Sequence, residues 1–197
     1  DSAQHAGSLI EALMRLSMAS RQPLELEPLS PEEIVADLAQ HLKHASDGFC
    51  LVQANTLPAC RADQTLVRQV FRNLLENACK FGGEKAPACA EVGGHVTESH
   101  VVYWVRDNGP GVPEAIRERL FLPFVRHKGQ HPEHQPLKDS WSSTGGNGIG
   151  LAIVQRVAER HGGRAWVECP DAGGSVFYFS LQREPGGGEA SASGERE

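Results

Sequence analysis

One stretch of the sequence carries two patterns at once. It runs from Gln64 to Phe81 and reads QTLVRQVFRNLLENACKF. Its apolar residues recur every three or four positions, which is the spacing of one face of an α-helix; they are Leu66, Val67, Val70, Phe71, Leu74, Leu75 and Ala78. Gly82 and Gly83 follow directly and favour a helix end. We therefore predict a long helix over residues 64–81 with its apolar face in a core.

The second pattern is a narrow polar stripe on the other side of this helix, formed by Gln69, Asn73, Asn77 and Lys80. Asparagine is a weak helix former, so two of them one turn apart need an explanation. One interpretation is a face turned to solvent. The other is a site where amide oxygens bind a hard cation such as Mg²⁺ and Lys80 meets the phosphates that accompany it. The spacing alone leaves both open.

A second motif, Asp107-Asn108-Gly109-Pro110-Gly111, directly follows a predicted strand over residues 100–106. It has the composition of a simple turn. Alternatively, Asp107 accepts a hydrogen bond from an exocyclic amine, and the glycines let a flat ring approach the backbone.

A third motif, Gly146-Asn147-Gly148-Ile149-Gly150-Leu151, leads into a predicted helix over residues 148–161. Glycines before a helix N-terminus favour an anion site, because unpaired N–H groups and the helix dipole face the ligand. The motif matches neither the G-x-x-x-x-G-K-[ST] loop nor the dinucleotide fingerprint with its preceding strand. A Walker-type NTPase and a Rossmann enzyme are therefore not supported.

Residues 122–146 lie between the second and third motifs and show no periodicity, and they are rich in Gly, Pro, His and Ser. A loop this long inside a compact domain is usually functional or mobile. His127, His131 and His134 have the spacing of metal ligands, but their polar surroundings and the absence of a cysteine partner favour an exposed loop surface.

The remaining elements indicate an α+β protein: a two-layer sandwich of a mixed β-sheet and about three helices, with a helix over residues 8–22 outside it. Strands are expected over 24–29, 49–57, 88–92, 100–106, 164–169 and 175–181, and further helices over 30–43 and 114–120. Trp104 and Trp166 alternate with apolar residues inside strands, which favours places in the core or on the sheet.

Composition narrows the function classes. The chain has 197 residues and a formal net charge of −6, which disfavours general binding to nucleic acid. It contains no apolar run of the ~18–20 residues that span a bilayer. Its five cysteines include no C-x-x-C pair, which favours free thiols in a reducing, cytoplasmic compartment. Residues 184–197 are poor in apolar residues and are expected to be disordered.

The order and spacing of these motifs resemble the N, G1, F and G2 boxes of the GHKL ATPase superfamily. The resemblance is specifically to the catalytic ATP-binding domain of bacterial sensor histidine kinases, and it covers about residues 24–183. The N box is Asn73–Phe81, the G1 box is Asp107–Gly111, the F box is Leu120-Phe121-Leu122-Pro123-Phe124, and the G2 box is Gly146–Leu151. The resemblance implies the GHKL (Bergerat) ATP-binding fold.

The resemblance also implies roles for residues of the N box. Asn77 would bind Mg²⁺, Asn73 would support that site, and Lys80 would contact phosphate, so these three form the expected catalytic group. Phe81 stands where the family often has an aromatic residue beside the adenine.

The other boxes complete the implied ATP site. Asp107 would receive the adenine amino group, and Gly109 and Gly111 would make room for the base. Residues 122–146 become the ATP lid, in which Arg126 and Lys128 could reach the γ-phosphate. The remaining expected ATP-binding residues anchor the lid or hold the phosphates: Phe121, Phe124, Gly146, Asn147, Gly148, Ile149, Gly150 and Leu151.

The resemblance divides the chain into three parts. Residues 1–22 would be the end of the second helix of a dimerisation and phosphoacceptor hairpin, residues 23–183 the ATP-binding domain, and residues 184–197 a disordered tail. His5 is followed by Ala6-Gly7 instead of an acidic residue, so the phosphoacceptor histidine is expected upstream of this chain. The chain should therefore bind Mg·ATP without phosphorylating itself.

The implied function is transfer of the ATP γ-phosphoryl group to that histidine, for relay to an aspartate of a response-regulator receiver domain. The implied assembly is a homodimer through the hairpin that contains residues 1–22, with no nucleic-acid partner and no membrane contact by this segment. Two alternatives come from other classes. One is a GHKL protein of another kind, either an anti-sigma-factor serine kinase or an ATP-driven clamp, although such clamps commonly have an acidic base where Asn73 stands. The other is a non-catalytic nucleotide-binding module, whose boxes should be eroded.

Overall fold

The computed structural model describes residues 22–45, 50–53, 55–82, 88–125 and 148–183, together with single positions in the first 21 residues. Most of the expected helix over residues 8–22, the central part of the expected lid and the expected disordered tail lie outside the described residues.

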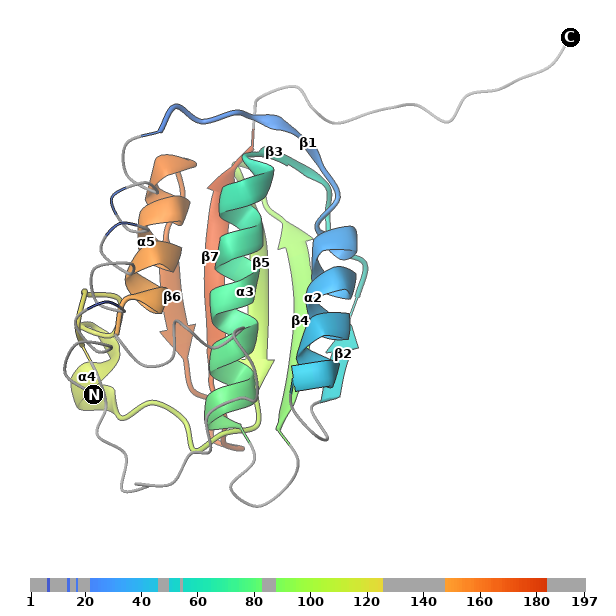
Figure 1. Ribbon diagram of the computed structural model, residues 1–197. Helices are drawn as coiled ribbons and strands as arrows, with labels where there is room; N and C mark the ends of the chain where they lie inside the picture. Colours follow the sequence, from blue (N-terminus) through green and yellow to red (C-terminus); the bar gives the residue numbers. More distant parts are fainter. Residues whose placement is uncertain are drawn as a thin grey trace, which may run out of the picture.

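Helices and strands form the two layers that the sequence predicts (Figure 1). The elements in chain order are β1 (Glu27–Leu29), α2 (Pro31–Ala45), β2 (Cys50–Gln53), β3 (Cys60–Ala62), α3 (Gln64–Phe81), β4 (Cys89–Val96), β5 (His100–Asp107), α4 (Glu114–Arg117), α5 (Gly150–Arg160), β6 (Ala165–Glu168) and β7 (Val176–Gln182). Five strands form a mixed sheet in the order β2-β4-β5-β7-β6, in which only the β2–β4 pair is parallel. β1 and β3 form a separate two-stranded sheet.

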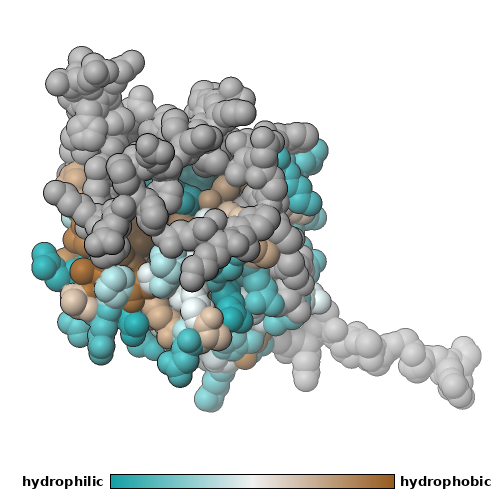
Figure 2. Space-filling view, turned by 90° about the horizontal axis from the view of Figure 1, so that it is seen from below, coloured by the Kyte–Doolittle hydropathy of each residue, from teal (hydrophilic) through white to brown (hydrophobic). Residues whose placement is uncertain are grey.

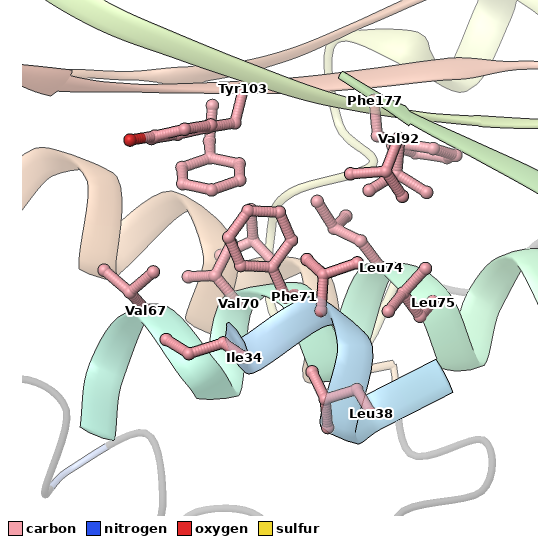
Figure 3. Packing of buried hydrophobic residues seen from close by; sticks show 14 of the residues in the cluster. Ile34, Leu38, Val67, Val70, Phe71, Leu74, Leu75, Val92, Tyr103 and Phe177 are labelled. Atoms are coloured by element: carbon pink, nitrogen blue, oxygen red, sulfur yellow. The ribbon is translucent and has the colours of Figure 1, made fainter. Parts of the chain in front are cut away.

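The core lies between this sheet and the helices α2, α3 and α5. Every apolar residue of the predicted α3 face is buried, and Asp63 caps the helix by accepting a hydrogen bond from the Leu66 N–H at 3.0 Å. Phe71 is fully buried at the centre (Figure 3). Its ring meets those of Tyr103 and Phe179 edge-on, with centroids 5.7 and 5.2 Å away.

A row of aromatic side chains lies on the other face of the sheet. Trp104, Tyr178 and Trp166 are register partners on β5, β7 and β6, and they alternate with the buried residues that face the helices. The Trp166 and Tyr178 rings stack at 4.9 Å, and the Trp104 ring occupies the space that a side chain at Gly93 would need. The two tryptophans are thus sheet-face residues, as their alternation predicts.

Four element predictions are wrong in their extents. The strand expected over residues 88–92 continues to Val96 as β4. The strand expected over residues 49–57 is shorter and ends at Gln53, and the unpredicted β3 follows Pro58. The strand expected from Leu24 begins only at Glu27, where pairing with β3 starts. The helix expected over residues 114–120 ends at Arg117, and the following residues form turns. The errors in the strands concern segments whose pairing depends on a distant partner.

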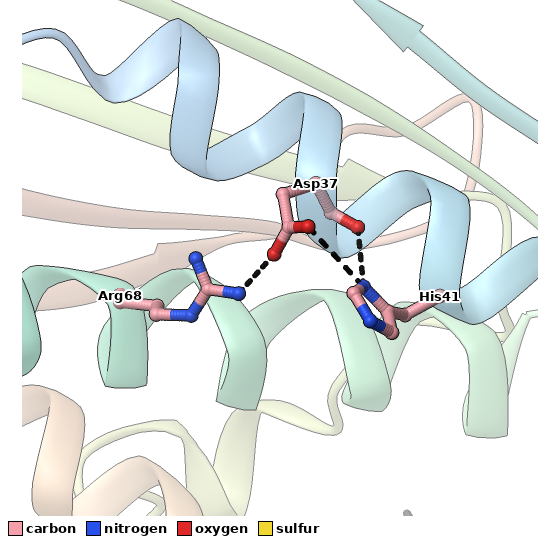
Figure 4. A network of polar contacts seen from close by, with 3 residues as sticks. All are labelled: Asp37, His41 and Arg68. Carbon is pink, nitrogen blue, oxygen red and sulfur yellow. Dashed lines mark hydrogen bonds and ion pairs between the residues drawn. The ribbon is translucent and has the colours of Figure 1, made fainter.

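A polar contact joins α2 to α3 on their outer side (Figure 4). The Asp37 carboxylate pairs with the Arg68 guanidinium, and His41 Nδ1 bonds the Asp37 carbonyl oxygen at 2.7 Å. All three side chains are more than 40% exposed, so this network contributes little to stability beyond fixing the helix pair.

His161 joins the end of α5 to the start of α3. Its Nδ1 lies 2.8 Å from the Val157 carbonyl oxygen, and its Nε2 accepts a hydrogen bond from the Asp63 N–H at 3.1 Å. Both contacts are satisfied together only in the neutral ring that carries its proton on Nδ1. Burial also lowers the pKa of His161 below 6.5.

This depressed pKa predicts a pH-dependent stability. Between the folded pKa and about 6.5 the unfolded chain binds more protons, so the contribution is complete above about pH 6.5 and is lost as the pH falls through that window. Urea unfolding between pH 8 and 5 should show a free energy of unfolding that falls on acidification, by no more than about 1.4 kcal/mol per pH unit from this group. His161→Gln, which retains an acceptor for Asp63, should have a flatter profile; identical slopes for the two proteins would contradict this assignment.

Candidate nucleotide site

The end of α3 and the loop after β5 meet at the lower end of the molecule in Figure 1, and the start of α5 contacts α3 further up, at Asn73. The backbones of the α3 end and of the loop after β5 lie directly against each other. A Cβ at Gly109 would lie 2.6 Å from the Phe81 carbonyl oxygen, so only glycine fits there. Figure 2 views this end from below and shows hydrophobic surface beside hydrophilic surface on the described residues.

Asp107 ends β5 with its carboxylate almost fully buried, at 6% exposure. Its Oδ1 accepts hydrogen bonds from the backbone N–H of Gly109 at 2.8 Å and of Ser175 at 3.1 Å. Burial raises the pKa of Asp107, and the bonds from Gly109 and Ser175 oppose that rise. The result is a fixed acceptor whose Oδ2 takes neither backbone bond.

The polar stripe of α3 does not face solvent throughout. Asn73 is only 6% exposed and donates a hydrogen bond from Nδ2 to the Gly150 carbonyl oxygen at 3.1 Å, which ties α3 to the first residue of α5. Asn77 lies one turn further along the same face and is half-buried, and its side chain makes no hydrogen bond to another described residue. Lys80 is half-buried too, and its Nζ lies 5.1 Å from the centroid of the Phe81 ring, which is 44% exposed. The solvent-face interpretation therefore fails at Asn73.

Among the described residues, no side chain caps the start of α5. Its N-cap residue, Ile149, makes no capping hydrogen bond through its side chain, and the first-turn N–H groups have no acceptor within the helix. The Ile149 side chain is buried in the core, and Leu151 packs partly against that core. Of the expected G2 residues, Gly146 and Asn147 lie outside the described residues, and Gly148 and Gly150 are part of this junction.

The two ends of the expected lid are joined. The Phe124 N–H donates to the Gly148 carbonyl oxygen at 2.8 Å, and both residues have positive φ, at 66° and 68°. A Cβ at Gly148 would lie 3.0 Å from the Phe124 backbone. Phe121 packs partly against the core, whereas the Phe124 side chain is 51% exposed.

Gly174 belongs to none of the sequence motifs, yet it contacts the loop after β5. Its N–H donates to the Gly109 carbonyl oxygen at 3.1 Å, and its φ is +79°. A Cβ at this position would overlap the Asp107 carbonyl oxygen. Gly111, with φ +83°, packs against the Gly174 carbonyl oxygen. The signal was the pair Gly173-Gly174 directly before a strand, but its partner lies more than 60 residues away.

Gly174→Ala and Gly173→Ala should therefore differ sharply. Both positions have positive φ, so both variants carry the cost of about 1 kcal/mol or more of forcing alanine into that region. A Cβ at Gly173 meets nothing within 4 Å, whereas one at Gly174 meets the Asp107 backbone. Chemical denaturation should show Gly174→Ala to be the less stable protein by about 1–3 kcal/mol. Equal stability of the two variants would show that the 171–174 turn does not support the loop.

A cavity of about 310 Å³ lies beside the same loop. Its walls come from β4, the end of β5 and the following turn, and from residues 172–174; no residue of α3 or α5 lines it.

Among the described residues there is no group of three His, Cys, Asp or Glu side chains that could hold a metal ion. No helix of the described part is long and apolar enough to cross a membrane.

Comparison with known proteins agrees with this geometry. The family model "Histidine kinase-, DNA gyrase B-, and HSP90-like ATPase" matches residues 62–185, which include the end of β3, all of α3 and every element after it. The chain belongs to this family.

Proteins with similar sequences include sensory kinases. The chain is 31% identical over 175 residues to the "Phytochrome-like protein Cph1" of Synechocystis sp., covering 88% of this chain and 22% of that protein. It is 41% identical over 128 residues to the "Adaptive-response sensory kinase SasA" of Prochlorococcus marinus strain MIT 9313, covering 64% of this chain and 31% of that protein. A full-length ShkA crystal structure in complex with AMPPNP superposes with a TM-score of 0.71 at 26% identity, over 91% of this chain and 36% of that one. The chain thus spans less than a third of the length of these two curated relatives.

These comparisons confirm the predicted α+β sandwich and the resemblance to the ATP-binding domain of histidine kinases.

Proposed function

We propose that this chain is the catalytic part of a two-component sensor histidine kinase, and that it transfers the γ-phosphoryl group of ATP to a histidine on a dimerisation hairpin. The observation that carries the proposal is the placement of three features along α3: the start of α5 bonded to Asn73, Asn77 one turn further on, and the loop of the buried acceptor Asp107 packed against the end of the helix. They match the chemistry of a nucleotide: Asp107 fits an amino-bearing base, and Asn77 and the start of α5 fit an anionic, metal-bound phosphate chain.

Asp107 would bind the adenine amino group through Oδ2, because Oδ1 is held by two backbone donors. The phosphates would lie against the start of α5, where unpaired N–H groups and the helix dipole favour negative charge. Lys80 would leave the Phe81 ring to meet a phosphate oxygen. Gly148 and Phe124, which join the lid ends, would let the lid close over the nucleotide and exclude water.

The residues present fit a bound magnesium ion. Asn77 offers a half-buried carboxamide with no other described partner, about 6 Å along α3 from Asn73, and Mg²⁺ retains several waters and needs few protein ligands. Asn73 would hold α5 in place for this site through Gly150. When bound, Mg²⁺ would neutralise charge on the transferring phosphoryl group. Because Asn73 is an amide donor to a backbone carbonyl, it offers no general base for an ATP-hydrolysing clamp.

The proposal extends to the rest of the protein. Residues 1–22 would end the second hairpin helix, through which two copies would form a dimer, and residues 184–197 would be a disordered tail. The phosphoryl group would pass on to an aspartate of a response-regulator receiver domain. The domain would act in the cytoplasm, in keeping with the free thiols of Cys60, Cys79, Cys89 and Cys169.

Label transfer tests this proposal. The chain is incubated with γ-labelled ATP, Mg²⁺ and a separately produced two-helix hairpin domain of a sensor kinase that carries the acceptor histidine. We expect acid-labile, base-stable label on the hairpin and none on this chain. Asn77→Ala should slow transfer by at least about 10- to 100-fold, and Asn55→Ala, on a distant loop, should not change it. ATP hydrolysis without labelled hairpin would contradict the kinase assignment, and label on the isolated chain would place an acceptor within it.

A further inference from the structure

Asn108 carries a contact that the proposed ATP site does not use. β4 and β5 pair antiparallel, and their last paired residues are Ala90 and Asp107. The next pair in this register would be Cys89 and Asn108. The Cys89 N–H donates a hydrogen bond to the Asn108 side-chain Oδ1 at 2.9 Å instead of to a backbone acceptor. The side chain thus continues the strand pairing by one step while the backbone of Asn108 turns away.

This turn of the backbone brings Gly109 within hydrogen-bond distance of Asp107 and Gly174. The Gly109 N–H reaches back to Asp107 Oδ1 at 2.8 Å, and the Gly109 carbonyl oxygen accepts from Gly174. If the backbone of residue 108 continued the β-ladder, the chain would run on along β4 and could not close this loop on Asp107. The contact at Cys89 therefore lets the loop leave the sheet without leaving a strand N–H unsatisfied.

The same side chain also touches the end of α3. A Cβ at Gly82, the C-cap of that helix, would lie 2.7 Å from Asn108 Oδ1, so glycine is needed for the side chain to fit. Gly109 in turn lies against the Phe81 carbonyl oxygen. Asn108 therefore lies where the start of β4, the end of β5 and the end of α3 meet.

We propose that Asn108 is a positioning residue for ATP binding: it fixes the loop that carries Asp107 relative to the end of α3, which carries Asn77, Lys80 and Phe81. The proposal rests on the proposed function and deepens it, since Asn108 would act on the base through Asp107 and would not itself need to touch the nucleotide. Loss of its side chain would leave Asp107 present but its loop less well held, so the base would bind more weakly.

Calorimetric titrations of adenosine and of Mg·ATP into Asn108→Ala and Asn108→Asp test this proposal. Asn108→Ala loses the acceptor for Cys89, and both ligands should bind about 5- to 10-fold more weakly, by similar factors, because the shared adenine contact is affected. Asn108→Asp retains Oδ1, and with adenosine, which has no phosphates to repel the added charge, affinity should return to within about twofold of the unaltered chain.

Asn55→Ala is the matched control. Asn55 also bonds the β4 backbone, through Gly94 at 3.0 and 3.1 Å, but at the strand end away from the loop. Thermal unfolding of all three variants separates stability from binding. Loss of stability in Asn108→Ala with unchanged affinity, or weaker binding in Asn108→Asp equal to that of Asn108→Ala, would overturn the positioning role. Failure of the unaltered chain to bind ATP would instead refute the proposed function.

Discussion

Asp107→Asn is expected to weaken ATP binding by about 100-fold or more while leaving the protein folded. The reason is the orientation of the side chain. Two backbone N–H groups, of Gly109 and Ser175, converge on Oδ1 and would hold the oxygen of the asparagine amide in the same place. Its NH₂ group would then point toward the base, where it would meet the adenine amino group, and two donors cannot bond. The substitution also removes the buried charge whose desolvation raises the pKa of Asp107, so we expect the protein to remain folded.

The same geometry predicts a change of base preference. Inosine triphosphate carries a carbonyl oxygen where ATP carries the amino group, so Asp107→Asn should bind it better than ATP, the reverse of the unaltered chain. Asp171→Asn makes the same chemical change at an exposed position of the neighbouring turn and should bind ATP normally. Fluorescence competition titrations measure the affinities of the three proteins for both nucleotides. Unchanged ATP affinity in Asp107→Asn would overturn the adenine assignment.

Phe71→Ala should lower the free energy of unfolding by about 3–5 kcal/mol. The Phe71 ring is fully buried and packs edge-on against Tyr103 and Phe179, so its removal leaves a cavity in the middle of the core. A domain of this size is stable by only about 5–15 kcal/mol, so much of the protein should be unfolded in mild urea.

Phe81→Ala provides the comparison within the same helix. The Phe81 ring is 44% exposed, so this variant should lose less than about 1 kcal/mol of stability. In urea titrations followed by far-UV circular dichroism, comparable losses for the two variants would show that the interface between α3 and the sheet is packed differently from what Figure 3 shows.

The extents of α3 follow from the sequence because its periodicity is long and its ends are marked locally. The apolar spacing runs over five turns to Gly82, and the observed helix spans the predicted residues 64–81. Strands close to β5, β6 and β7 are also expected from the sequence. The strand β3 could not be predicted, because a three-residue strand is defined by its pairing with β1 and has no pattern of its own.

The same difference between local patterns and long-range contacts applies to the site. Its motifs are local and could be identified, but the contacts that organise it are not. Asn73 bonds Gly150, 77 residues away, and Gly174 packs on Asp107 across the sheet. No spacing in the sequence indicates either contact, since each depends on where the finished sheet brings two chain segments together.

The most direct test of the central claim, that ATP binds where α3 ends, β5 ends and α5 begins, is a ¹⁵N amide titration of this chain with Mg·ATP. Binding there should produce saturable shifts that are largest at Gly109, Gly150 and Ser175 and small at the Trp166 indole on the opposite sheet face. Saturable shifts at the aromatic row of that face, with Gly109 and Ser175 unchanged, would contradict it.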